Sequence, residues 1–398
     1  MRSYYVFFLV SEPTLKYCKP LVPSIVATIA LFASTSALAV TDEEFKALQD
    51  QLNQLADAVE KSSSTETSKV HIGGYGELHY NNLEKPDGSE FKQLDFHRFV
   101  LFFGYDFSDS IRFHSEIEIE HAFVADNNDA SGDTAPGAVE LEQAYIEFDL
   151  TENMEARGGL FLIPVGILNE THEPPTFYGV ERNPIEKNII PSTWWEGGAA
   201  LTGRFGGSGV SYDLAITSGL NDGTDIRGGR QKVAKATAND PAYTGRLKYT
   251  GLRGLELAGT ANYQTDMTQS QDPDINEGLL LSAHAIYNIS QFQLRALYAN
   301  WDIDVTSTDP DIQAQDKQDG YYLEGSWKFL PGAGVFVRYN AWDNGGTGDT
   351  EETQTDIGIN YWPHEDVVIK FDIQKQDNGA VYAADEQDGF NIGIGYQF

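Results

Sequence analysis

The chain has 398 residues, of which 41% are hydrophobic and 12% aromatic, and its mean hydropathy is −0.37. This average is too polar for a bundle of membrane helices, and after residue 40 no run approaches the ~20 apolar residues that one such helix needs. The 20 tyrosines argue against a disordered chain. A formal charge of −33 and the polar average remain compatible with a transmembrane β-barrel, because only every second residue of its strands must be apolar.

Residues 1–39 have the pattern of an export signal. Basic residues precede a mostly apolar run from Leu21 to Phe32, and Ala37-Leu38-Ala39 matches an A-x-A cleavage site. An uncleaved anchor helix is the alternative, but the apolar run is short and ends in small residues. Cleavage would leave 27 − 3 = 24 basic and 60 − 1 = 59 acidic residues, a net charge of −35. It would also remove the single cysteine, Cys18, which excludes disulfides and thiolate metal sites from the exported chain.

Residues 40–68 are predicted to form a short periplasmic helix followed by a linker. Thr41 and Glu44 have the spacing of a capping box, and residues 62–68 are rich in serine and threonine. Apolar residues then recur at the 3-4 spacing of a coiled-coil seam: Phe45, Leu48, Leu52, Leu55 and Val59. The seam is shorter than three heptads, so the helix is predicted and a coiled coil stays an open hypothesis.

From residue 69 to residue 398 the chain consists of alternating stretches separated by turns and loops. In the clearest stretch, which starts at Ile111, apolar residues alternate with ionisable ones. A row of ionisable groups cannot face hydrocarbon, so this face must meet water. The last stretch, 389–398, is apolar on one face and small or polar on the other, and it ends in Phe398. An aromatic carboxyl terminus on an alternating strand is similar to the closing strand of bacterial outer-membrane barrels.

Sixteen strands are predicted in total, over residues 71–80, 96–107, 111–123, 139–150, 154–163, 198–205, 210–217, 243–249, 255–264, 279–289, 292–302, 321–329, 335–343, 355–362, 367–375 and 389–398. Seven tight turns alternate with eight longer loops, and residues 164–197 form the longest connection. Outer-membrane barrels have even strand numbers, with short turns at one end and long loops at the other. The predicted fold class is therefore all-β, a 16-stranded antiparallel transmembrane β-barrel with an aqueous lumen.

Four motifs resemble the phosphate-selective porin O and P family of bacterial porins. They are Gly73-Gly74-Tyr75-Gly76-Glu77, Asp95-Phe96-His97-Arg98, Glu142-Gln143-Ala144-Tyr145-Ile146 and residues 159–166. The resemblance implies a homotrimer of channels in the outer membrane of a Gram-negative bacterium, with the long third loop folded into the pore. It also implies phosphate-like anions as permeants.

The predicted partners follow from the same resemblance. They are outer-membrane lipid and lipopolysaccharide, small-solute permeants, and the barrel-assembly machinery, which would recognise the strand ending in Phe398. Nucleic acid is not expected as a partner, and no cofactor is expected because the permeants would follow their own gradients.

If the apolar faces point to lipid, the charged residues of the opposite faces line the pore. The candidates are Arg98, Arg112, His114, Glu116, Glu118, Glu120, Arg157, Arg204, Arg246, Lys248, Arg295, Lys328, Arg338 and Lys370. A loop that narrows a wide barrel also sets its selectivity. The constriction-loop candidates are Glu170, His172, Glu173, Glu181, Arg182, Glu186, Lys187, Trp194 and Trp195. Placement of the two tryptophans in an interfacial aromatic belt stays open as an alternative.

Several functional alternatives remain open. Lumenal arginines suit an anion path, because guanidinium groups match phosphate oxygens. Basic and acidic walls facing each other would instead give a transverse field with little ion preference. A carbohydrate-selective porin and an outer-membrane lipase or protease are further alternatives. The chain contains neither an H-E-x-x-H nor a G-x-S-x-G motif, and His114 beside Glu116 and Glu118 is better explained by solvation in the lumen than by a metal.

Overall fold

The structure is a computed structural model that describes residues 68–124 and 137–398. The predicted export signal (1–39) lies outside the described residues, as do the predicted periplasmic helix and its linker up to residue 67. Within the part of the chain that is described, no helix has the length and apolar character that a membrane crossing requires.

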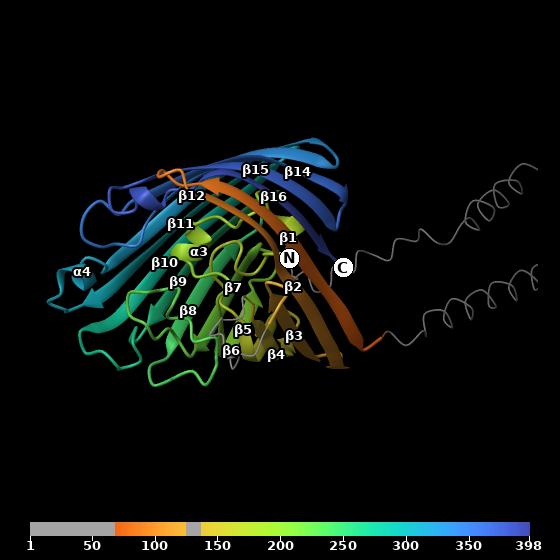
Figure 1. Cartoon of the computed structure of the whole chain (residues 1–398). Coiled ribbons are helices and arrows are strands. Elements are labelled where there is room, and N and C mark those ends of the chain that lie inside the picture. The colour runs from red at the N-terminus through yellow and green to blue at the C-terminus, as the bar shows by residue number, and fades with distance from the viewer. Residues whose placement is uncertain (1–67, 125–136) are drawn as a thin grey trace, which may run out of the picture. The chain divides into compact units, whose positions relative to one another are not determined.

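The two described segments form sixteen strands that close into one antiparallel barrel, as the alternating pattern predicts (Figure 1). The first eight strands are β1 (Val70–Glu84), β2 (Glu90–Ser108), β3 (Ile111–Glu120), β4 (Val139–Thr151), β5 (Met154–Leu162), β6 (Trp195–Arg204), β7 (Val210–Thr217) and β8 (Ala242–Tyr249). The second eight are β9 (Leu255–Gln264), β10 (Ile275–Ile289), β11 (Phe292–Val305), β12 (Lys317–Leu330), β13 (Ala333–Asp343), β14 (Glu352–His364), β15 (Val367–Asn378) and β16 (Asp388–Gln397).

Each strand pairs with its neighbours in sequence, and the first strand closes the sheet on the last. In β1 and β16, Tyr75 lies opposite Gln397 and Glu84 lies opposite Asp388. Phe398 extends this pairing, because its backbone N–H donates to the Gly74 carbonyl oxygen at 2.9 Å and its carbonyl oxygen accepts from the Gly74 N–H at 3.0 Å. Closure leaves no unpaired sheet edge, which is what a sheet surrounded by lipid requires.

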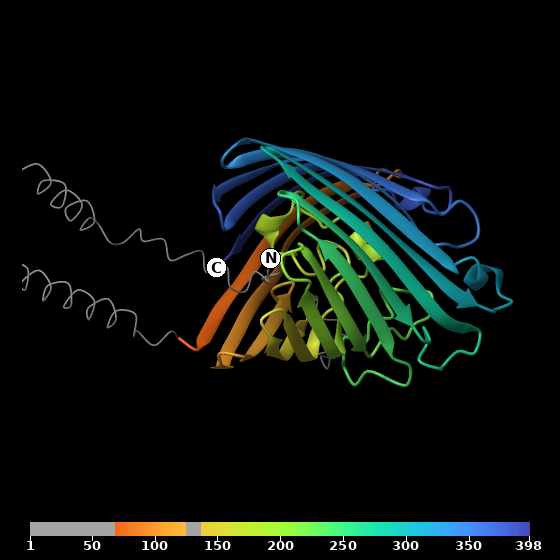
Figure 2. The same cartoon turned by 180° about the vertical axis from the view of Figure 1, so that it is seen from behind.

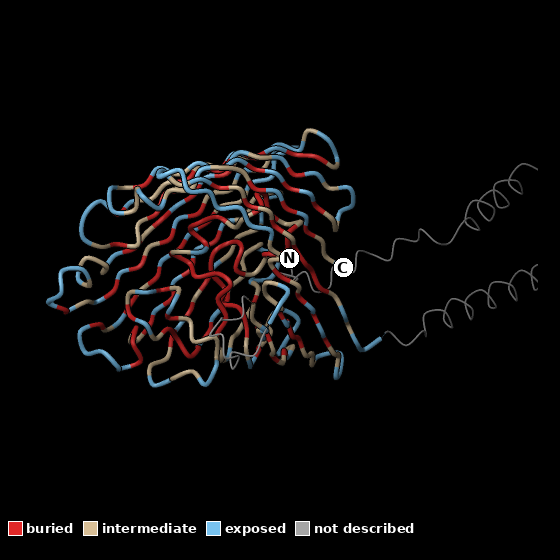
Figure 3. Tube along the Cα trace, in the orientation of Figure 1, coloured by how far each residue is buried: buried red, intermediate tan, exposed pale blue. Residues whose placement is uncertain are grey.

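Buried and exposed residues alternate along many of the strands (Figure 3). Most of the large exposed residues are apolar, and many of the buried ones are polar or charged. On β2 the Phe103 side chain is 42% exposed, whereas Arg98 is only 6% exposed. On β3 the row of ionisable residues turns inward, with Glu116 and Glu118 each 1% exposed. The outward face therefore suits hydrocarbon, and the charged face lines the interior.

Several strands extend further at the long-loop end than the sequence predicts. The loop between β1 and β2 is reduced to residues 85–89, and β12 starts at Lys317 rather than at residue 321. In these extensions the alternation of apolar and polar residues is lost, because polar residues such as Asn82 and Lys92 pair across the hairpin. Alternation reports only the part of a strand that separates lipid from water, so it underestimates strand length beyond that part.

One side of the interior is apolar, which the rule of polar inward faces did not predict. Near the long-loop end of β10 to β12 the inward side chains include Leu280, Leu297, Trp301 and Tyr322, all nearly completely buried. On the same stretch of β11 the aspartates at 302 and 304 are exposed and point outward. The prediction that inward faces are polar is thus wrong for this wall, and the reason is that a loop packs on it.

Candidate functional site

The connection between β5 and β6, residues 163–194, is here called L3. It lies inside the barrel rather than over its rim, as Figures 1 and 2 show from opposite sides. L3 contains the short helices η2 (Pro174–Thr176) and α3 (Ile185–Asn188). Inward side chains from distant strands donate hydrogen bonds to its carbonyl oxygens: Arg295 to Thr176 at 2.9 Å, Asn360 to Phe177 at 3.1 Å, Arg338 to Tyr178 at 3.3 Å and Trp301 to Ile189 at 2.9 Å.

The apolar part of L3 packs on the apolar wall of β10 to β12. Ile185, Ile189 and Ile190 are fully buried, and the Trp194 ring lies 6.3 Å from the Trp301 ring. The indole N–H of Trp194 donates to Glu196 at 3.1 Å. Trp195 is the first residue of β6 and is 3% exposed. Neither tryptophan therefore belongs to a lipid-facing aromatic belt: both lie in the interior.

Small residues on the inward face of β16 make room for the other side of L3. A Cβ built on Gly395 would lie 2.2 Å from Pro174 Cβ, and one on Gly393 would lie 3.1 Å from a Val180 methyl group. Backbone N–H of Val180 also donates to the Asp372 carboxylate of β15 at 2.6 Å. The alternation of glycine with apolar residues in the last strand is thus explained on both faces, by lipid outside and by L3 inside.

Glu186 is one of the predicted constriction residues, and its carboxylate holds L3 in shape. One oxygen accepts from the backbone N–H groups of Ile167 and Leu168, both at 2.6 Å. The other accepts from the Asn183 amide at 2.9 Å. Because Glu186 is completely buried and these donors compensate its charge, it does not face a water-filled passage.

An acidic wall lies on β3 and β4, opposite the apolar wall in strand order. It is formed by Glu116, Glu118 and Glu142, whose side chains are almost fully buried. Gln143 donates to Glu116 at 2.6 Å, but neither oxygen of Glu142 accepts a hydrogen bond from any described residue. His172 of L3 approaches this wall, with its Nε2 3.4 Å from Glu116. Glu173 follows His172, and burial raises the pKa of its carboxyl group.

Three arginines from two loops face this acidic wall. Arg182 belongs to L3, and Arg227 and Arg230 belong to the loop between β7 and β8. Their guanidinium groups donate to L3, Arg227 to the Ser192 carbonyl oxygen at 2.8 Å and Arg230 to the Thr193 carbonyl oxygen at 2.6 Å. Burial, followed by the charges of the other two arginines, lowers the pKa of Arg227 to about 10. We call these three residues the basic cluster.

Most of the predicted lumenal arginines are paired with carboxylates. Arg98 contacts Glu77 at 2.8 Å and Glu118 at 3.3 Å. The other arginine pairs are Arg112 with Glu147 and Asp149, Arg246 with Asp213 and Glu170, and Arg338 with Glu324 and Asp356. Glu170 of L3 is thereby tied to β8. These arginines therefore do not form a row of uncompensated positive charge.

The remaining predicted pore and constriction residues fall into four groups. His114 and Arg157 are buried near Tyr145, whose ring lies 5.0 Å from the imidazole and 5.4 Å from the guanidinium carbon. Toward the tight-turn end lie Arg204, Lys248, Arg295 and Lys328, and Lys328 is exposed with its Nζ 4.4 Å from the Trp362 ring. Lys370 is buried with its Nζ 3.5 Å from the Phe177 ring. Glu120 and Lys187 lie toward the long-loop end, where Lys187 is exposed.

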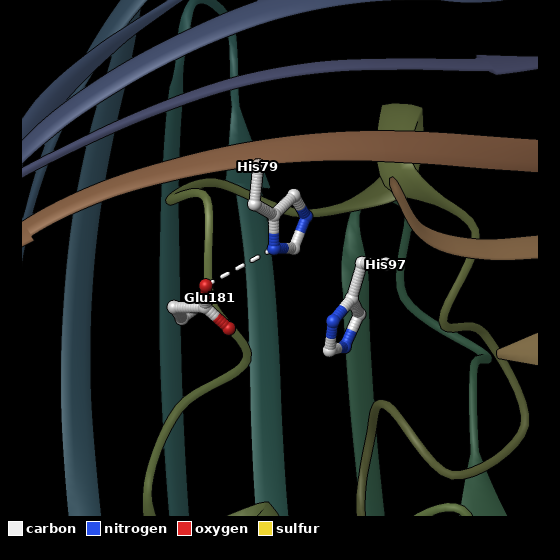
Figure 4. Close-up of side chains that lie close together, drawn as sticks. All are labelled: His79, His97 and Glu181. Carbon is white, nitrogen blue, oxygen red and sulfur yellow. Dashed lines mark hydrogen bonds and ion pairs between the residues drawn. The ribbon is translucent and has the colours of Figure 1, made fainter. Parts of the chain in front are cut away.

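A histidine cluster that the sequence did not predict lies at the junction of β1, β2 and L3. His79 Nδ1 lies 3.0 Å from Glu181 of L3, and the His79 and His97 rings stack at 4.7 Å (Figure 4). His97 in turn contacts Asp95, which also contacts His121 at 2.9 Å. Burial alone would raise the pKa of Glu181, but the facing His79 holds it well below its ordinary value. The inward parity of His79 was the available signal. Asp95 and His97 share the parity of the outward Phe103, and the register shift in the β1–β2 pairing between Glu77 and His79 could not be read from the sequence. Nor could the sequence place Glu181 beside them.

Comparisons with known proteins agree with this architecture. The family described as Gram-negative porin matches residues 201–381. An uncharacterized protein of Aquifex aeolicus (strain VF5) is 29% identical over 350 residues, which are 77% of this chain and 76% of that protein.

Among solved structures, the anion-selective porin from Comamonas acidovorans superposes with a TM-score of 0.59. That match has 13% identity and covers 83% of this chain and 99% of the other. The trimer form of OmpT, an outer membrane protein of Vibrio cholerae, matches with a TM-score of 0.53 and 12% identity over 83% of this chain and 100% of the other. These likenesses confirm the porin-like barrel fold, and together with the family match they support an outer-membrane location.

Proposed function

We propose that this protein is an outer-membrane channel for the passive diffusion of small hydrophilic solutes and ions. The observation that carries the proposal is a closed barrel with a polar inward face and with L3 folded inside it. Solutes would cross between the acidic wall (Glu116, Glu118 and Glu142) and the basic cluster. Charged side chains on opposite sides of a narrow passage orient dipolar solutes and set ion preference, and they need no cofactor.

We propose a weak cation preference for this passage. Arg98, Arg246 and Arg338 are each matched by two carboxylates, so these lumenal arginines carry no excess positive charge. The whole chain also carries a formal charge of −33, which favours cations near its mouth.

Selectivity for phosphate-like anions is the second candidate, and the basic cluster is the observation that favours it. Two of the three guanidinium nitrogens of Arg182 have no hydrogen-bond acceptor among the described residues, and guanidinium groups match phosphate oxygens. The sign of the reversal potential of purified protein in a planar bilayer, measured in a KCl gradient and then with potassium phosphate, separates the two candidates. A cation-selective potential with both salts supports the first, and an anion-selective potential that grows with phosphate supports the second.

We further propose that the protein has no catalytic activity. Among the described residues, His172 is surrounded by carboxylates and Tyr75 rather than by a serine nucleophile. Esterase and protease assays on purified protein test this directly. Turnover that disappears on substitution of His172 would replace the channel proposal with an enzymatic one.

The remaining proposals concern assembly. We propose a homotrimer, for which the outward face of β7 to β10 offers an apolar groove with small residues, including Gly245, Gly259 and Ala261. Residues 40–68, of which 40–67 lie outside the described part, are proposed to act as a periplasmic helix and linker. Crosslinking and native mass spectrometry of the full chain and of a variant lacking residues 41–68 test both ideas. An unchanged trimer in the deletion variant would show that the helix is dispensable, and a monomer in the full chain would contradict the trimer.

A further inference from the structure

Three of the eight histidines of the chain gather where β1, β2 and L3 meet. His79 comes from β1, His97 from β2, and His121 directly follows β3. Two groups of potential ligands overlap at His97: one consists of His79, His97 and Glu181, and the other of Asp95, His97 and His121. Histidine is the commonest side-chain ligand for metals in proteins, so this clustering points to a metal rather than to a solvated lumen wall.

The first group places its donor atoms close together. One ligand atom each of His79, His97 and Glu181 lie within 4.8 Å of one another, and the three side chains face a common space in Figure 4. A tetrahedral ion with bonds of ~2.0–2.2 Å holds its ligand atoms roughly 3.3–3.6 Å apart. Small side-chain rotations would therefore bring these three donors around one ion.

A carboxylate contacts one ring nitrogen of each imidazole, and the other ring nitrogen is then available to bind the ion. Glu77 lies 3.1 Å from His79 Nε2, which leaves Nδ1, the atom that faces Glu181. Asp95 lies 3.0 Å from His97 Nδ1, which leaves Nε2 as the ligand. Metal-binding histidines typically donate their second ring N–H to a carboxylate in this way, and that contact fixes the tautomer and orients the ring.

We propose that His79, His97 and Glu181 form a binding site for one divalent first-row transition-metal ion, with Glu77 and Asp95 as positioning residues. Two imidazoles and one carboxylate suit Zn²⁺ and its neighbours, whereas Mg²⁺ and Ca²⁺ prefer sites built from oxygen donors alone. The bound ion joins β1 and β2 to L3 through Glu181. The Glu181 side chain is 39% exposed, so the ion can enter from the aqueous side.

The other groups of potential ligands are less suited to such an ion. Glu116, Glu142 and His172 offer a single imidazole, and Gln143 already donates to Glu116. His364, Glu365 and Asp366 are consecutive residues of an exposed or half-exposed turn, where histidine and carboxylates are already solvated. The group at β1, β2 and L3 combines two imidazoles with access from water.

Titration with Co²⁺ tests the site without requiring channel activity, so its result is independent of the proposed function. The full exported chain, purified in detergent without a polyhistidine tag and treated with EDTA, is titrated with Co²⁺ and followed by its visible absorption. We expect one saturable equivalent that Zn²⁺ displaces. The variant Asp95→Asn should bind about 10–100-fold more weakly, because it loses a contact that orients His97. His79→Gln and His97→Gln, which remove a ligand, should bind more weakly still.

Matched variants make the outcome decisive. His284→Gln alters another buried histidine beside a glutamate, Glu256 at 3.1 Å, and should bind Co²⁺ like the wild type. All variants should keep the heat-modifiable gel mobility of a folded barrel. X-ray absorption of the Zn²⁺ form should show two imidazole ligands. Absence of saturable binding in the folded wild type, unchanged binding in His97→Gln, or loss of binding only in His172→Gln would each overturn the proposal.

Discussion

The two sides of the barrel interior differ in what holds them together. On β10 to β12 the inward face is apolar and carries L3 through the Trp194–Trp301 contact and three buried isoleucines of L3. On β1 to β4 the inward face carries charges, and its contacts are ion pairs such as Arg98 with Glu77. Apolar packing fixes a loop without needing water, whereas charged groups need water or partners. L3 is therefore anchored on the apolar wall, and we propose that solutes pass along the charged one.

Loss of the contact between Trp194 and Trp301, which anchors L3, should produce the largest effect. Trp194→Ala deletes a fully buried indole and should weaken the packing of L3 by about 3–5 kcal/mol. The barrel itself should persist, because its strands pair independently of L3. We expect a larger and noisier single-channel conductance and faster proteolysis within L3. Trp327→Ala, which alters an outward-facing tryptophan that is 43% exposed, should leave both measurements unchanged.

Removal of the Glu186 carboxylate should also loosen L3. Glu186→Ala leaves the N–H groups of Ile167 and Leu168 without their acceptor, at a cost of about 1–3 kcal/mol for each unsatisfied group. The temperature at which L3 becomes sensitive to protease should therefore fall. Glu152→Ala in an exposed turn is the control. Equal protease sensitivity of the two variants would contradict the structural role of Glu186.

Substitution of a glycine on the inward face of β16 tests how closely L3 packs against this strand. Gly395→Ala places a methyl group against Pro174 and should cost about 1–3 kcal/mol through forced displacement of L3 or β16. The expected result is a lower yield of folded barrel in detergent refolding. Gly325→Ala, whose added Cβ would have its nearest neighbour at 3.7 Å, should refold like the wild type. If both variants refold equally well, L3 does not press on β16.

Changes of charge along the proposed passage should have the smallest effect on stability and a measurable effect on ion preference. Glu120→Gln, at the half-buried end of β3, should shift the reversal potential toward anions, and Arg227→Gln should shift it toward cations. Interactions between partly solvated charges amount to ~0.2–1 kcal/mol, so permeability ratios should change by factors of a few. Glu365→Gln in the exposed turn before β15 should change nothing. Shifts of the same sign in Glu120→Gln and Arg227→Gln would contradict a passage with charges of opposite sign on its two sides.

The sequence predicted the barrel well because one physical rule governs every strand. Lipid outside and water inside impose a period of two, so the sixteen strands and the inward placement of Arg98, Glu116 and Glu118 follow from alternation alone. Alternation holds only in the part of a strand that separates lipid from water. The predicted β1 and β12 are too short because both strands continue beyond that part.

The candidate site was predicted less completely, because its geometry depends on where L3 runs. No periodicity relates residue 181 to residue 79, and the contact of Glu181 with His79 joins positions 102 residues apart. Likewise Glu186 and Trp194 were predicted to face the passage, but their burial follows from the apolar wall of β10 to β12. On that wall the alternation of polar inward residues with apolar outward residues is lost, and only the packing of L3 explains the loss.

Single-channel recording tests the central claim most directly. Purified full-length protein is reconstituted in a planar bilayer and recorded in symmetric KCl, first as the wild type and then as Trp194→Ala. The account predicts stepwise conductance increments in the wild type and larger increments in the variant. A folded barrel that inserts without any conductance, or a variant with wild-type increments, would contradict a passage that runs beside an anchored L3.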